Sequence, residues 1–167
     1  MIVRAPWRRN VVGGLVTAVA LAVITATQLW PSWSRYEVTV VPAHVVPVGG
    51  SVDVGGHVWR LGATTHPARA DRPYGPRQPA GTVRRVVTIE RSGGPDALPC
   101  TGVVTDGHRR WKAEGFNGFA VKLADGATES CARAGPLQWT FLLPGDVLPT
   151  AVDVVDFNGR IIVRLLL

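Results

Sequence analysis

The sequence predicts an all-β protein: an antiparallel β-sandwich preceded by one N-terminal transmembrane helix. Residues 11–30 carry no charge and follow a segment with several arginines. Beyond residue 36, short runs rich in Val, Ile and Thr alternate with Gly, Pro, Asn and Asp, which is the pattern of strands and turns. The chain has 167 residues, 46% of them hydrophobic, so it suits one ordinary domain plus a short appendage and is not a disordered chain.

The first predicted element is a transmembrane helix over residues 11–30. At about 1.5 Å per residue, a helix of this length spans the roughly 30 Å of hydrocarbon in a bilayer. Arg4, Arg8 and Arg9 lie before the span. The positive-inside rule therefore predicts that residues 1–10 form a cytoplasmic stub and that the rest of the chain lies outside.

Aromatic residues flank this span on both sides, with Trp7 before it and Trp30, Trp33 and Tyr36 at its far end. These are the positions of the two aromatic belts of a membrane helix. A cleaved signal peptide has the same order of basic and apolar segments, but its apolar core usually has only about 7–15 residues. We favour an uncleaved anchor. The alternative, secretion after cleavage, also places the rest of the chain outside the cytoplasm.

A linker at 31–35 is expected to lead into the exterior domain, residues 36–167. We expect eight or nine strands at the spacing of an antiparallel sandwich. These strands would be drawn from ten candidate runs, which are residues 36–41, 50–54, 57–61, 82–90, 101–105, 108–112, 119–123, 138–143, 152–157 and 160–166.

The last hairpin is the most specific prediction. Asn158-Gly159 is typical of a two-residue type I′ turn. That turn pairs Val155 with Ile162 and Asp153 with Arg164. The Asp153–Arg164 pair would lie on the solvent face and contribute about 0.2–1 kcal/mol. The opposite face would belong to the core and consists of Val152, Val154, Ile161, Val163 and Leu165.

Residues 66–81 form a long polar segment with four prolines and no apolar period. Long loops in compact domains are often functional. Arg69, Arg72, Tyr74 and Arg77 are candidates to contact an acidic or carbohydrate partner. The alternative, which we favour, is a solvated crossover between the two sheets.

Cys100 and Cys131 are the only cysteines, and both lie on the predicted exterior side, where disulfides persist. A bridge would close a loop of about 32 residues, for which the chain-entropy model gives roughly 3.7 kcal/mol. The alternatives are a nucleophilic or a metal-bound thiol, but neither cysteine lies in a recognisable nucleophile motif. We predict a disulfide.

No motif identifies a reaction or a cofactor. His44, His57, His66 and His108 are dispersed and lack the spacing of metal ligands. The net charge of +6 comes from arginines that are mostly scattered, whereas a nucleic-acid interface needs a clustered basic face. We predict no catalytic residue, no metal, no cofactor and no nucleic-acid partner.

The order of three segments resembles a known class of domains. These segments are His57-Val58-Trp59-Arg60-Leu61, then Asp106-Gly107-His108-Arg109-Arg110-Trp111 between the two cysteines, then Phe141-Leu142-Leu143-Pro144. The layout over residues 36–167 resembles the small immunoglobulin-like exterior domains of actinobacterial envelope proteins. The resemblance implies an immunoglobulin-like β-sandwich without an established catalytic site.

These observations predict a single-pass plasma-membrane protein, held in the membrane by residues 11–30. Its exterior domain would be a non-enzymatic binding or structural module of the cell envelope, with a protein or an envelope component as partner. Two alternatives stay open: an exterior hydrolase that acts on cell-wall polymers, and an accessory subunit of a membrane complex.

Overall fold

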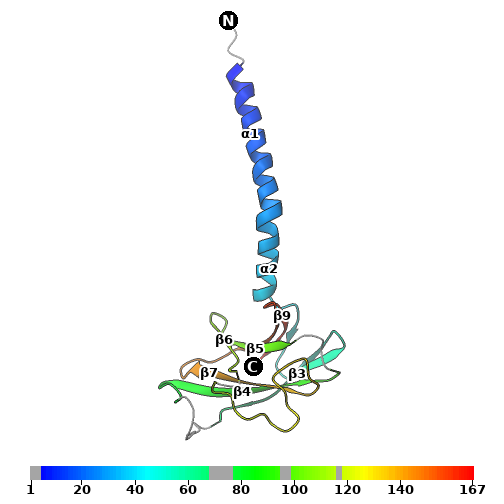
Figure 1. Cartoon of the computed structure of the whole chain (residues 1–167), viewed down its shortest axis with the longest axis vertical. Coiled ribbons are helices and arrows are strands. Elements are labelled where there is room, and N and C mark those ends of the chain that lie inside the picture. Colours follow the sequence, from blue (N-terminus) through cyan, green and yellow to red (C-terminus); the bar gives the residue numbers. More distant parts are fainter. Residues whose placement is uncertain (1–4, 68–76, 95–98, 116–117) are drawn as a thin grey trace. The chain divides into compact units, whose positions relative to one another are not determined.

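Figure 1 shows the computed structural model of the protein, which describes residues 5–67, 77–94, 99–115 and 118–167. The chain divides into two compact units, Met1–Thr39 and Val40–Leu167. The first unit is helical from Ala5 onward, and the strands of the described residues lie in the second.

The N-terminal helix is continuous and has three segments. They are α1 (Ala5–Ile24), the π-helical turn η1 (Thr25–Leu29) and α2 (Trp30–Val40). In η1, the backbone N–H of Trp30 donates to the carbonyl of Thr25, five residues earlier. Pro31 follows at once, and a proline ring clashes with the carbonyl four residues before it. The wider turn makes room for this ring without breaking the helix.

One expectation for residues 31–41 was wrong. The expected strand over 36–41 does not form, because α2 continues through Val40, and residues 31–35 of the expected linker belong to the same helix. Over six residues, an alternating run of β-branched side chains does not distinguish a strand from a helix. Extending an existing helix costs little, whereas starting a new element requires nucleation.

The second unit is a β-sandwich, as predicted. One sheet has the strand order β1 (Val45–Val46), β9 (Ile161–Leu166), β8 (Ala151–Asp156), β5 (Cys100–Thr105) and β6 (Arg110–Lys112). The other has the order β2 (Ser51–Val54), β3 (His57–Thr65), β4 (Thr82–Arg91) and β7 (Leu137–Pro144). Neighbouring strands are antiparallel except for β1 and β9, which are parallel.

Inward-facing side chains of the two sheets form one core. The largest are Trp59, Trp139 and Phe141, each of which is at most 3% exposed. The sheets approach closely at Gly102, where an added Cβ would lie 2.5 Å from Cε3 of Trp139. Only a glycine leaves room for the indole ring at this point. The predicted core face of the last hairpin is confirmed, since its five residues are each 0% exposed: Val152, Val154, Ile161, Val163 and Leu165.

The predicted strand over residues 119–123 does not form. This segment instead follows β7 through side-chain hydrogen bonds. The N–H of Val121 donates to Oγ1 of Thr140, and the N–H of Ala124 donates to Oε1 of Gln138. These side chains replace the backbone ladder that a tenth strand would make, and they cover the edge of the four-stranded sheet.

The turn of the last hairpin differs from the prediction. Asp153 pairs with Arg164 as expected, but Val155 pairs with Ile161 rather than Ile162, because the register shifts after Val154. Gly159 has a φ of +85° and is the one turn residue in the left-handed region. A type I′ turn needs two such residues, whereas a three-residue loop with a glycine bulge needs one. The glycine bulge at Gly159 accounts for the shift in the register of β8 and β9.

Candidate functional site

The predicted partner-binding residues are only partly described by the structure. Arg69, Arg72 and Tyr74 lie outside the described residues, and Arg77 is exposed. Contact of these residues with an acidic or carbohydrate partner therefore stays a prediction.

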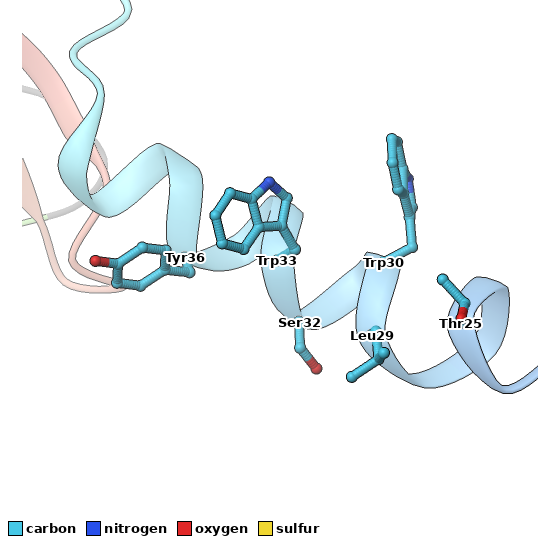
Figure 2. Close-up of a pocket in the computed structure, with 6 residues that line it drawn as sticks. All are labelled: Thr25, Leu29, Trp30, Ser32, Trp33 and Tyr36. Carbon is cyan, nitrogen blue, oxygen red and sulfur yellow. The ribbon is translucent and has the colours of Figure 1, made fainter.

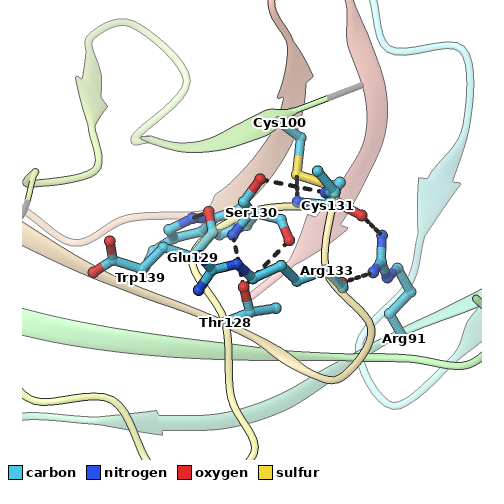
Figure 3. The surroundings of a disulfide bond; sticks show 9 residues. Arg91, Cys100, Thr128, Glu129, Ser130, Cys131, Arg133 and Trp139 are labelled. Atoms are coloured by element: carbon cyan, nitrogen blue, oxygen red, sulfur yellow. Dashed lines mark hydrogen bonds between the residues drawn. A yellow bond between two sulfur atoms is a disulfide. The ribbon is translucent and has the colours of Figure 1, made fainter. Parts of the chain in front are cut away.

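The predicted disulfide is formed between Cys100 and Cys131, whose Cα atoms are 5.2 Å apart. It joins β5 of the five-stranded sheet to the segment that leads into β7 (Figure 3). We call residues 128–136 of this segment the clamped loop, because side chains from the sandwich hold its backbone. The backbone N–H of Cys131 also donates to Sγ of Cys100, over 3.1 Å.

Three backbone carbonyls of the clamped loop accept hydrogen bonds from long side chains of neighbouring strands. Nε1 of Trp139 donates to the carbonyl of Glu129 over 2.9 Å. Nη1 of Arg91 donates to the carbonyl of Cys131 over 3.0 Å, and Nη2 of the same guanidinium donates to the carbonyl of Arg133. Figure 3 shows the guanidinium reaching both carbonyls. These hydrogen bonds hold the loop backbone at Glu129, Cys131 and Arg133.

Arg91 is buried, with 7% of its surface exposed. Its guanidinium lies 5.7 Å from the ring centroid of Trp59, which is the distance range of a cation–π contact. A buried arginine is costly unless its donors find acceptors, and the two loop carbonyls provide them. The charge of Arg91 therefore stabilises this one loop conformation.

The clamped loop has the properties of a preformed binding surface. Its exposed residues, Ala132, Arg133 and Ala134, are carried on a backbone that is already ordered. A loop that is fixed before binding loses less conformational entropy when it binds. Its one exposed charge is the cation Arg133, and the carboxylate of Glu129 is half-buried.

A second polar cluster lies in the five-stranded sheet and corrects an expectation. Asp153 is 0% exposed, so it does not lie on a solvent face. Arg164 donates to both of its carboxylate oxygens, over 2.6 and 2.9 Å, and Arg110 donates to Oδ2 over 3.1 Å. The hydrogen bond to Asp153 raises the pKa of Arg164. The two guanidinium groups cover the carboxylate, so we assign the cluster to the stability of the fold and not to a binding site.

The helix carries an apolar groove at the turn between η1 and α2. Figure 2 shows its lining residues, which are Thr25, Leu29, Trp30, Ser32, Trp33 and Tyr36. The three aromatic side chains are exposed, and the rings of Trp33 and Tyr36 have centroids 5.9 Å apart. These are the residues that the sequence places at the outer aromatic belt.

Arg91 is not among the predicted site residues, although the sequence carries a signal for it. Arg91 follows Val87 and Ile89 at alternate positions of β4, so all three share the core-facing side of the strand. An arginine at such a position predicts a buried cation with fixed acceptors. In the described part of the chain, no three His, Cys, Asp or Glu side chains gather as metal ligands.

No family model matches the chain, and neither a curated protein nor a solved structure is significantly similar to it. Function is therefore inferred from the residues of the chain itself.

Proposed function

We propose that this protein is a single-pass membrane protein that holds a non-enzymatic, immunoglobulin-like β-sandwich outside the cytoplasm, where it binds a component of the cell envelope. The observation that carries this proposal is the helix segment Asn10–Val40, which is long and apolar enough to cross a membrane and has no buried residue in its apolar window. So large an exposed apolar surface is unfavourable in water and favourable in a bilayer.

The disulfide supports the exterior location of the sandwich. Disulfides form and persist in oxidising compartments and are rare in the cytoplasm. The three arginines before residue 10 support a cytoplasmic N-terminus. The aromatic residues Trp30, Trp33 and Tyr36 would then lie at the outer boundary of the bilayer.

The clamped loop supports a binding role for the sandwich. Arg91, Trp139 and Cys100 hold its backbone, while Arg133 stays exposed. A loop that is held at this many points loses less conformational entropy when a partner binds.

The location can be tested by cysteine labelling, because both native cysteines are in the disulfide. Leu148 in the sandwich is exposed, and Trp7 precedes the apolar span. We expect a membrane-impermeant maleimide to label Leu148→Cys on intact cells, and to label Trp7→Cys only after the membrane is permeabilised. The reverse pattern would contradict the proposed orientation. A mature protein that lacks the N-terminal span by mass spectrometry would show a cleaved signal instead of an anchor.

A further inference from the structure

We propose that the outward side of the five-stranded sheet is a further contact surface of the sandwich. It binds a protein segment rich in acidic and aliphatic side chains, and Lys112 is the cation that contacts the acidic groups. This inference rests on the proposed function, since it names a class of envelope component that the exterior sandwich would bind.

One row of register partners crosses all five strands on this side of the sheet. Directly paired residues of neighbouring strands point to the same side, and Asp153 lies opposite the core face of β8, so the whole row faces outward. From β6 to β1, the row consists of Lys112, Val103, Asp153, Arg164 and Val45.

This side carries a surplus of positive charge. Arg110 also faces outward, because it lies two residues before Lys112 on β6. Three outward cations, Arg110, Lys112 and Arg164, thus face one outward carboxylate, that of Asp153. The buried cluster keeps its role in the fold, but its two guanidinium groups outnumber its one carboxylate. Lys112 adds a second surplus charge.

Lys112 is the group available for a contact. It is exposed, and among the described residues its ammonium has no ion-pair or hydrogen-bond partner. A hydrogen bond between an ammonium and a carboxylate is charge-assisted and therefore stronger than one between neutral groups.

Acidic side chains near the ends of these strands do not cancel the surplus. Asp106, in the turn before β6, is paired with Arg109 over 3.1 Å. Asp156 accepts backbone N–H groups in the turn after β8, and the exposed Arg160 in that turn carries the opposite charge. Glu114 accepts a backbone N–H of the loop that follows β6.

The outward side of the four-stranded sheet provides an internal comparison. Its described strand residues carry the cations Arg60 and Arg84 and the acids Asp53 and Glu90, so the charges balance. Arg60 is moreover the register partner of Glu90. Charge therefore distinguishes the two sides of the sandwich and favours an acidic partner at the five-stranded sheet.

Aliphatic side chains in the same row favour a polypeptide over a polymer of phosphate groups. Val103 lies between Lys112 and Asp153, and Val45, at the end of the row, is 49% exposed. Covering these valines removes apolar surface from water, which a segment with its own aliphatic side chains can do. A phosphate polymer would meet the charge but would bring only polar groups to the valines.

The test uses Lys112 and Lys122, which are the two lysines of the sequence and are both exposed. The full chain in mild detergent is acetylated with and without a peptide of alternating glutamate and valine, and mass spectrometry measures acetylation at each lysine. We expect the peptide to slow acetylation of Lys112 several-fold and to leave Lys122 unchanged. High salt should abolish the protection, because it screens exposed charges.

Matched variants and probes decide between this surface and general attraction to a basic chain. Lys112→Gln should bind the fluorescent peptide several-fold more weakly, whereas Lys122→Gln should bind it as the native chain does. Equal weakening in both variants, or no protection of Lys112, would overturn the inference. A peptide of alternating glutamine and valine should not protect Lys112. Equal protection by polyphosphate would overturn the assignment to a polypeptide.

The cysteine labelling proposed above separates failure of this inference from failure of the proposed function. If Lys112 is not protected but Leu148→Cys is labelled on intact cells, the exterior sandwich stands and this contact surface is wrong. If Leu148→Cys is not labelled on intact cells, the proposed function is wrong whatever the peptide does.

Discussion

Replacing Asp153 by Ala should destabilise the sandwich much more than the loss of a surface ion pair. The carboxylate is 0% exposed and accepts hydrogen bonds from Arg164 and Arg110. Its removal leaves two guanidinium groups side by side on the sheet without the charge that holds them.

The magnitude follows from the exposure of the two partners. Breaking a fully buried ion pair costs about 3–5 kcal/mol, and an exposed pair contributes about 0.2–1 kcal/mol. The side chains of Arg164 and Arg110 keep 25% and 35% of their surface exposed, so water can partly solvate them after the change. We expect a loss of about 3 kcal/mol for Asp153→Ala, at the lower end of the buried range.

The measurement is denaturant unfolding of the full chain in mild detergent, followed by the emission of the buried indoles of Trp59 and Trp139. Asp146→Ala is the matched control, because it removes the same charge from an exposed position of the same unit. The control should change the free energy of unfolding by no more than about 0.5 kcal/mol. A change of less than about 1 kcal/mol for Asp153→Ala would refute the reasoning from burial.

Three further predictions concern local features. Gly102→Ala should cost at least about 1–3 kcal/mol by overpacking against an indole ring of β7, whereas Gly94→Ala meets no atom within 4 Å and should be nearly neutral in the same unfolding assay. Reducing the disulfide should lower the free energy of unfolding by about 2–5 kcal/mol, measured with and without reductant. The carboxylate of Asp106 accepts hydrogen bonds from the backbone N–H of Arg109, which has the larger effect, and from that of His108. These bonds lower its pKa from 3.8 to about 2. Its stabilising contribution should therefore be full above pH 3.8 and lost as the pH falls through about 2, which an NMR titration of the carboxyl group can follow.

Local sequence determined the features that depend on composition and short-range pattern. The uncharged run at residues 11–30 predicted the helix, and the presence of just two cysteines predicted the disulfide. Alternation of apolar side chains predicted the core face of β8 and β9. These predictions succeeded because burial of apolar side chains acts along a single element, where the sequence shows the period directly.

Where the sequence pattern predicted the wrong conformation, side-chain hydrogen bonds between distant segments determined the structure. Residues 119–123 have the composition of a strand but pair with Thr140 and Gln138 through side chains instead of a backbone ladder. Thr140 is 19 residues away from the amide that it binds, and Gln138 is 14 residues away from its own. No short-range period in the sequence contains that information.

Burial of charge was likewise decided only by the tertiary structure. Alternation correctly placed Asp153 on the face opposite the core strip, but it could not show that Arg164 and Arg110 close over that face. Arg91 becomes a clamp only because the loop carbonyls of Cys131 and Arg133 come within reach of its guanidinium. The sequence by itself determined the elements and their apolar faces. Which polar groups are buried depends on partners that only folding brings together, because a buried charge is stable only where acceptors or opposite charges surround it.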